Sequence, residues 1–218
     1  MAPLIFVLGA YLIGSISFAV VVSWCFGLPD PHTYGSGNPG ATNVLRTGKK
    51  SAAVLTLLGD AAKGAFALWL ARRLAPNFVV GDITLAAVAF AAFIGHLYPI
   101  YFGFKGGKGV STAAGILLAL DLRIGCVALT VWLLTVFAFR YSSLASMVSA
   151  LAATLATFYF LGGSPYVWMV LATTTLLLWR HRGNARRLRS GTESRIRLLG
   201  SSSDPDPSAD APRTPETP

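Results

Sequence analysis

The sequence predicts an all-α protein, a polytopic membrane bundle of about seven transmembrane helices with its N-terminus outside and its C-terminus in the cytoplasm. Of its 218 residues, 54% are hydrophobic and only 12% are charged, and the mean hydropathy is +0.59. A soluble domain carries roughly 25% charged residues. The apolar residues also form runs long enough to cross a bilayer as helices, while the alternating segments of a membrane β-barrel are absent.

Seven apolar segments are expected to be spans, and the first is retained because no basic segment precedes it. The fourth is short, since an α-helix from Gly109 to Leu120 rises only about 18 Å. Either the preceding glycines extend it, or it starts below the membrane surface with its N-terminal N–H groups facing a polar cavity. The expected bounds are roughly 3–27, 51–71, 84–102, 108–121, 123–139, 142–161 and 164–180.

The distribution of Lys and Arg sets the orientation. The outer loops carry only Arg72, Arg73 and Arg123, whereas the inner loops carry the remaining basic clusters, the typical positive-inside bias. Seven arginines between Arg180 and Arg197 indicate topology and contact with anionic lipid rather than nucleic-acid binding. The inner set is Arg46, Lys49, Lys50, Lys105, Lys108, Arg140 and the segment 180–197.

Two regions are expected along the chain. Residues 1–199 form the membrane domain, and residues 200–218, rich in Pro, Ser and Asp, form a disordered tail because they lack the apolar residues needed for a core. Cys25 and Cys126 lie in apolar runs and are expected to be small buried residues rather than a disulfide or metal site.

The loop from Tyr34 to Arg46 is expected to bind phosphate. Its glycines let the backbone approach an anion, its side chains supply neutral donors, and Arg46 supplies a planar guanidinium suited to phosphate. A turn-rich connection is the alternative, because Gly, Pro, Asn and Ser are turn residues anyway. The candidates within the loop are Ser36, Gly37, Asn38, Gly40, Ala41, Thr42, Asn43 and Arg46.

A second polar island contains Lys105, Gly106, Gly107 and Lys108. It is not a nucleotide P-loop, because the glycine spacing is wrong and Gly109 rather than Ser or Thr follows the lysine. Two lysines beside flexible glycines at the N-terminus of a helix can still bind an anion. The alternative is a hinge carrying positive-inside lysines.

Other polar residues lie near the same face. His96, inside a span, is either a binding residue or a packing residue, and Asp60 with Lys63 is either catalytic or a structural ion pair. Ser143 opens the sixth span, where a serine is usually an N-cap. His181 and Asn184 close the seventh, and His32 is assigned no role.

Several catalytic arrangements are missing from the sequence. There is no glycosidase-like carboxylate pair, no Cys/His cluster with metal-ligand spacing and no G-x-S-x-G elbow. None of the three histidines has an Asp five residues later, so the dyad of soluble glycerolipid acyltransferases is absent. No metal and no cofactor are expected.

Four motifs resemble those of the bacterial membrane acyltransferase family that uses acyl phosphate and glycerol 3-phosphate. They occur in the family's order, the first two are long and specific, and the resemblance as a whole covers roughly residues 1–195. They are GSGNPGATNVLR (Gly35–Arg46), GHLYPIYFGFKGGKGVSTAAG (Gly95–Gly115), RYSSLAS (Arg140–Ser146) and HRGNARRLRSGTE (His181–Glu193).

The resemblance implies transfer of an acyl group from acyl phosphate to glycerol 3-phosphate, giving lysophosphatidic acid and phosphate on the cytoplasmic face of a bacterial inner membrane. The expected partners are the two substrates and membrane lipids, without nucleic acid or an obligate protein partner. The implied catalytic residues are Ser36, Arg46, Lys105, Ser143, His181 and Asn184, while Thr42, Asn43, His96 and Lys108 line the same walls as weaker candidates.

Two other functions remain open from the residues themselves. A carrier of phosphorylated metabolites also uses broken helices and buried cations, but it needs access to both faces and usually shows an inverted repeat, which this sequence lacks. A lipid-binding scaffold fits the basic C-terminal segment but leaves the loop from Ser36 to Arg46 unexplained.

Overall fold

The computed structural model describes residues 1–78 and 80–196, and every regular element in these ranges is a helix. This confirms the all-α class, while the predicted disordered tail 200–218 lies outside the described residues. The elements are α1 (Ala2–Gly14), α2 (Phe18–Cys25), α3 (Ala41–Val44), η1 (Leu45–Thr47), α4 (Lys50–Phe78), α5 (Asp82–Leu97), η2 (Ile100–Phe102), α6 (Val110–Leu120), α7 (Leu122–Phe139), α8 (Ser142–Leu161), α9 (Pro165–Arg180) and α10 (Arg182–Arg189).

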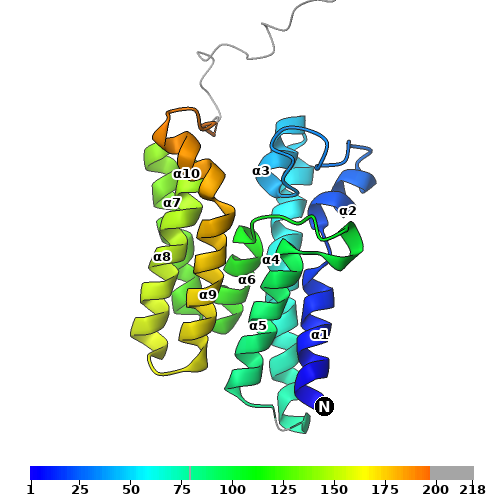
Figure 1. The fold of residues 1–218 in the computed structure, drawn as a ribbon, viewed down its shortest axis with the longest axis vertical. Helices are drawn as coiled ribbons and strands as arrows, with labels where there is room; N and C mark the ends of the chain where they lie inside the picture. The colour runs from blue at the N-terminus through cyan, green and yellow to red at the C-terminus, as the bar shows by residue number, and fades with distance from the viewer. Residues whose placement is uncertain (79, 197–218) are drawn as a thin grey trace, which may run out of the picture.

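The long helices stand side by side in two groups (Figure 1). One group contains α1, α4, α5 and α6, and the other contains α7, α8 and α9. Two contacts join the groups, α6 against α7 and α5 against α9. The short helices α2, α3 and α10 gather with the long loops at one end of the bundle, at the top of Figure 1, which is called the loop end below.

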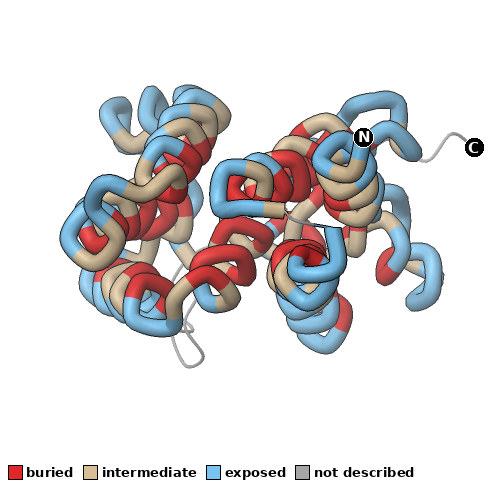
Figure 2. The backbone as a smooth tube through the Cα atoms, turned by 90° about the horizontal axis from the view of Figure 1, so that it is seen from below, coloured by how far each residue is buried: buried red, intermediate tan, exposed pale blue. Residues whose placement is uncertain are grey.

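The surface of the bundle is that of a membrane protein. Side chains such as Phe137, Leu155, Phe158 and Trp168 are more than half exposed, although they are large and apolar. Figure 2 shows buried backbone facing the inside of each group and exposed backbone facing outward. Among the described residues, four helices are long and apolar enough to cross a membrane, or five if the bent pair α1 and α2 counts as one span.

Every predicted apolar segment is helical, but the first is not one straight helix. It divides into α1 and α2, which are bent by 40° around residues 15–17. The Ser15 hydroxyl donates to the Tyr11 carbonyl at 2.8 Å, and the freed Ile16 carbonyl accepts a hydrogen bond from Lys63 at 2.6 Å. The break is therefore held by side chains rather than left to solvent.

Two further expectations are settled by the structure. The glycines before α6 do not extend it, because Gly109 caps the helix in the left-handed conformation (φ 83°) and the helix starts at Val110. Cys25 and Cys126 are both free and exposed, so the expectation that they are buried is wrong. Each lies on the outward side of an apolar helix, where a small thiol suits a lipid environment.

Glycine allows the helices to approach closely. A Cβ atom on Gly14 of α1 would overlap the Ala92 carbonyl of α5, and one on Gly95 would overlap the Tyr11 carbonyl. A Cβ on Gly115 of α6 would overlap the Ala61 carbonyl of α4. Such small-residue contacts are the usual way in which membrane helices pack, since lipid provides no hydrophobic drive for association.

At the opposite end of the bundle, side-chain hydrogen bonds connect neighbouring helices. Arg72 of α4 donates to the carbonyls of Ala119 and Leu120 at 2.5 and 3.2 Å, which satisfies the C-terminal end of α6. Tyr166 of α9 donates to Asp82 of α5 at 2.9 Å. These bonds fasten both groups of helices away from the loop end.

We expect Gly14→Ala to lower the free energy of unfolding by about 1–3 kcal/mol, because the added methyl group must push α1 away from α5. Gly9→Ala is the matched control on the same helix, since nothing lies within 4 Å of a Cβ at that position. Thermal unfolding in detergent measures both. Equal stability of the two variants would contradict the close contact.

Candidate functional site at the loop end

Asn43 organises the first polar loop. Its Oδ1 accepts from the Ser36 backbone N–H at 3.0 Å and from the Ser36 hydroxyl at 3.2 Å. Its Nδ2 donates to the carbonyls of Pro31 and Tyr34 at 2.8 and 3.2 Å. Asn43 is buried, with 2% of its surface exposed, so it shapes the loop from α3 rather than presenting its amide to a ligand.

Arg46 lies against the same loop. A Cβ on Gly35 would come within 3.1 Å of the Arg46 guanidinium, and Gly35 and Gly37 both have positive φ (59° and 64°). Only glycine allows this backbone to curl under the arginine without strain. The remaining candidates of the loop, which form its outer turn and the start of α3, are Asn38, Gly40, Ala41 and Thr42.

Residues 103–109, called the glycine strap below, connect η2 to α6. Gly106 and Gly107 are buried, because a Cβ on Gly106 would overlap the His96 carbonyl and one on Gly107 would meet the His96 ring and the Pro39 carbonyl. Arg180 of α9 donates to the carbonyls of Gly106 (2.7 Å) and Gly107 (2.9 Å). The strap therefore touches the first loop, α5 and α9 at once.

A second wall forms around Glu193. Its Oε1 accepts from the Ser143 hydroxyl and from Asn184 Nδ2, both at 2.6 Å, and its Oε2 accepts from Arg187 at 2.7 Å. Asn184 Oδ1 in turn accepts from Lys108 Nζ at 2.5 Å. This network connects the strap to α8 and α10. Burial raises the pKa of the Glu193 carboxyl, but these donors more than offset it and hold that pKa below its ordinary value.

Lys108 is the cation of this wall. Burial lowers its pKa to about 8, and although Glu193 opposes the shift, the positive charges of Arg187, Arg180 and Arg46 add to it. The strap joins the first loop to the second wall, because Gly107 lies against the Pro39 carbonyl and Lys108 bonds to Asn184. An anion placed between them would meet three or more cationic groups.

His181 lies between α9 and α10 and is almost fully buried. Its Nδ1 lies 2.8 Å from the Leu177 carbonyl, which can only accept, so Nδ1 carries the hydrogen. Burial is the main cause that lowers its pKa to about 4. The ring is therefore neutral near pH 7, and its Nε2 presents a lone pair.

A buried ionic group supports the strap from below. Lys63 Nζ lies 2.8 Å from Asp60 Oδ1, and both side chains are almost inaccessible. His96 lies 3.6 Å from the same carboxylate and 3.1 Å from the Thr112 hydroxyl. Because Lys63 also holds the Ile16 carbonyl, the pair braces the break between α1 and α2. Both side chains are shielded from any ligand at the loop end, which favours the structural alternative.

Most of the predicted site residues with polar side chains form two walls, whereas Lys105 and His96 belong to neither. Ser36, Asn43 and Arg46 form the first wall, and Lys108, Ser143, His181 and Asn184 form the second. Lys105 joins neither through its side chain, since its ammonium makes no hydrogen bond or ion pair with the described residues, although its carbonyl is bound. His96 contacts the strap through Gly107 but is buried beneath it.

Sequence reasoning missed the residues that hold the walls together, above all Glu193 and Arg180. A signal for Glu193 was present, because it is the single carboxylate within the arginine-rich segment 180–197. Arg180 carried no signal, since its bonds go to backbone carbonyls. Within the described part of the chain, no group of His, Cys, Asp and Glu could hold a metal ion.

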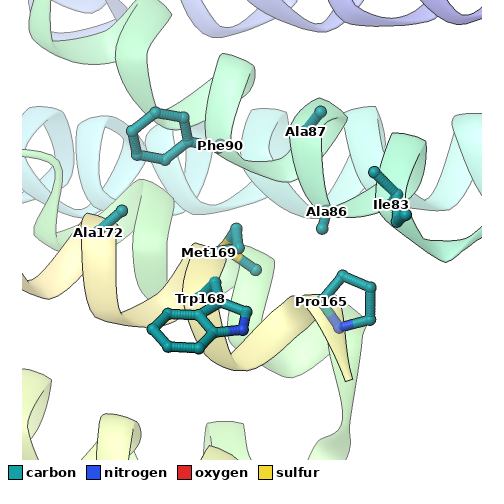
Figure 3. Close-up of a pocket in the computed structure, with 8 residues that line it drawn as sticks. All are labelled: Ile83, Ala86, Ala87, Phe90, Pro165, Trp168, Met169 and Ala172. Atoms are coloured by element: carbon teal, nitrogen blue, oxygen red, sulfur yellow. The ribbon is translucent and has the colours of Figure 1, made fainter. Parts of the chain in front are cut away.

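The described hollows are apolar and lie below the polar walls. One of about 290 Å³ lies between α5 and α9 (Figure 3), and another of about 540 Å³ lies between α1 and α4. Phe90, Met169 and Trp168 point into the first. Its lining is Ile83, Ala86, Ala87, Phe90, Pro165, Trp168, Met169 and Ala172.

The fold and its loop end define a helical integral membrane protein with cationic and polar side chains gathered at one end of the bundle. Residues 4–191 match the protein family described as glycerol-3-phosphate acyltransferase. The chain belongs to this family, so its reaction class is acyl transfer to glycerol 3-phosphate. The polar loop end therefore belongs to an acyltransferase rather than to a carrier or a scaffold.

Curated relatives and solved structures agree with this. Glycerol-3-phosphate acyltransferases of Cupriavidus necator and Ralstonia pickettii are 56% and 57% identical, over 90% and 89% of this chain and 97% and 94% of their own lengths. Crystal structures of PlsY (YgiH), an integral membrane glycerol 3-phosphate acyltransferase, match in the glycerol 3-phosphate form (TM-score 0.84, 37% identity) and the lysophosphatidic acid form (0.81, 36%). Both alignments cover 91% of this chain and 98% and 97% of the matched chains.

We expect Glu193→Gln to lower the free energy of unfolding by about 1–3 kcal/mol, because the neutral amide accepts less strongly from Ser143, Asn184 and Arg187. The control is Ser194→Ala at the exposed neighbouring position. Thermal unfolding in detergent measures both.

The contribution of Glu193 also has a pH dependence. Since its pKa is lowered on folding, the stabilisation is complete above the ordinary glutamate value of 4.5 and is lost as the pH falls through the lower folded value. Wild type and Glu193→Gln should therefore converge in acid. A constant difference at all pH values would show that the carboxylate charge does not matter.

Proposed function

We propose that this chain transfers an acyl group from acyl phosphate to the primary hydroxyl of glycerol 3-phosphate, releasing lysophosphatidic acid and inorganic phosphate on the cytoplasmic face of the inner membrane. The observation that carries the proposal is the pair of cationic walls joined by the strap, one with Arg46 and one with Lys108. Two phosphate-bearing substrates need two anion sites within reach of each other. Neither a nucleotide moiety nor a carrier protein is required to present the acyl group.

The first wall suits the phosphate of one substrate. Arg46 offers a bidentate guanidinium, and the positive-φ glycines beneath it leave the backbone open to an anion. The Ser36 hydroxyl donates to Asn43 through a bond of 3.2 Å, which a phosphate oxygen can replace. Lys105, free of partners among the described residues, supplies a second cation from the strap.

The second wall suits the reacting groups. The Ser143 hydroxyl already donates to Glu193 at 2.6 Å, so Ser143 is better placed to hold Glu193 than to bind phosphate. One N–H of the Asn184 amide donates to Glu193. The other N–H can donate to the carbonyl oxygen that becomes negative in the transition state. Lys108 donates a hydrogen bond to Asn184 Oδ1, so its ammonium would lie close to the same oxygen.

The neutral His181 orients the attacking hydroxyl. Its Nε2 lone pair accepts a hydrogen bond, but a pKa of about 4 makes it a weak base. In the proposed reaction the hydroxyl oxygen forms the new ester bond, the acyl–phosphate bond breaks, and the proton goes to the departing phosphate. Positioning and charge neutralisation are then the main contributions of the protein.

The acyl chain is proposed to lie in the hollow between α5 and α9. Both helices end at the polar walls, α5 near His96 and α9 at Arg180. Phe90 lies six residues before His96, about 9 Å along the helix. An acyl chain can therefore remain among apolar side chains while its phosphate reaches the loop end.

The test is phosphate release and lysophosphatidic acid formation by purified protein given palmitoyl phosphate with and without glycerol 3-phosphate. Release that needs both substrates supports the proposal. Arg46→Ala should lose about 100-fold or more in kcat/KM, and Lys49→Ala, an exposed cation nearby, should stay within about twofold. Release without glycerol 3-phosphate, or acyl transfer only from acyl-CoA, would reject the proposed donor.

We expect kcat/KM to fall as the pH rises above about 8, because Lys108 then loses its proton and one wall loses its cation. Lys108→Arg should remove this decline, since a guanidinium stays charged. The ratio of the two proteins at each pH separates Lys108 from ionisation of the substrates. A ratio that does not change with pH would exclude this role for the Lys108 charge.

A further inference from the structure

His32 lies in the loop between α2 and α3, and the proposed reaction gives it no role. Its Nδ1 lies 2.7 Å from Asp30 Oδ1, and its Nε2 lies 2.8 Å from the carbonyl oxygen of Lys105. The side chain is 22% exposed. His32 therefore bridges the first polar loop and the glycine strap, which are separated by 73 residues in the sequence.

The two partners determine the protonation of the ring. A carboxylate and a carbonyl oxygen can only accept hydrogen bonds, so both ring nitrogens must donate, and only the imidazolium has two N–H groups. The backbone N–H of His32 also donates to Asp30 at 2.9 Å. This bond and the His32 side chain hold the pKa of the Asp30 carboxyl below its ordinary value, so the carboxylate is ionised near neutral pH.

Each end of the bridge is attached to a defined part of the site. On the loop side, Asn43 binds the carbonyls of Pro31 and Tyr34, on either side of His32, and also binds Ser36. His32 thus projects from the same frame that shapes the first wall. A local change at His32 need not disturb that frame, because none of these bonds uses the ring.

On the strap side, the bound carbonyl belongs to Lys105. The preceding residue, Phe104, has φ 60°, a left-handed conformation that non-glycine residues avoid. Such a conformation persists only where the surroundings hold it. The Lys105 ammonium has no partner among the described residues, so the point from which its side chain extends is set by how this stretch of backbone is fixed.

We infer that His32 is a positioning residue: as an imidazolium held by Asp30, it clamps the Lys105 carbonyl and thereby aims the Lys105 ammonium at a substrate phosphate beside Arg46. The inference rests on the proposed function, because that proposal assigns Lys105 to phosphate. It adds a residue that acts through the backbone of another and never touches substrate.

Charged groups surround the clamp. The Asp30 carboxylate comes from the same loop, and Arg180 from α9 binds the next two carbonyls of the strap.

The experiment compares the wild type with His32→Ala, His32→Arg and Thr33→Ala. His32→Ala removes the clamp, and His32→Arg restores a permanent cation with several donors. Thr33→Ala is the matched control, since it deletes a hydrogen bond to the Asp30 carbonyl in the same turn but leaves the bridge to Lys105 intact. For each protein, kcat/KM is measured from about pH 6 to about pH 9, together with thermal stability and calorimetric titration of inorganic phosphate.

We expect His32→Ala to lose about tenfold in phosphate affinity and in kcat/KM near pH 6.5, the loss typical of one charge-assisted hydrogen bond. His32→Arg should recover most of it, because a guanidinium stays charged and offers several donors. Thr33→Ala should match the wild type in affinity.

Three results would overturn the inference: unchanged phosphate affinity and kcat/KM in His32→Ala, no recovery in His32→Arg, or an equal loss in Thr33→Ala. A loss of thermal stability that accounts for the loss of activity would show a structural role only. Failure of the proposed function is distinguishable, because a wild type inactive with acyl phosphate still reports on the clamp through phosphate titration.

Discussion

The buried ion pair of Asp60 and Lys63 is the constraint on which the loop end depends. Inside a membrane bundle an unpaired charge costs several kcal/mol. The two residues therefore pair with each other and with further polar groups nearby. Lys63 also donates a hydrogen bond to the Ile16 carbonyl at the break between α1 and α2. The carboxylate of Asp60 faces His96, whose ring supports Gly107 of the strap. One pair therefore fixes four helices relative to the glycine strap.

Above this pair, the site is built from backbone as much as from side chains. The strap can pass over His96 only because Gly106 and Gly107 have no Cβ, and Arg180 then holds the two exposed carbonyls. The first loop contributes the cation of Arg46 and the second wall that of Lys108. Burial, and after it the positive charges of Arg187, Arg180 and Arg46, disfavours the protonated form of Lys108.

Much of this could be predicted from the sequence. Runs of apolar residues predicted a helical membrane protein, because a segment inside the bilayer must satisfy its backbone hydrogen bonds within itself. The loop from Ser36 to Arg46 and the strap could be singled out by their glycines, amides and cations, and their role as anion sites stays a prediction. Ser143, His181 and Asn184 were found through resemblance, and their assignment to chemistry stays a prediction.

What the sequence determined by itself was local: which segments are helical, where they stop, and which residue types gather in the loops. Only the tertiary structure decided which polar groups are already used. The Asn43 amide is hydrogen-bonded within its own loop, and the Ser143 hydroxyl donates to Glu193. The His32 ring is hydrogen-bonded to Asp30 and to the Lys105 carbonyl. Several of these pairings join residues tens of positions apart, and the bonds of Arg180 and of His32 to the strap end on backbone carbonyls, which carry no residue-specific signal. For that reason Arg180 and His32 became visible only once the helices were packed.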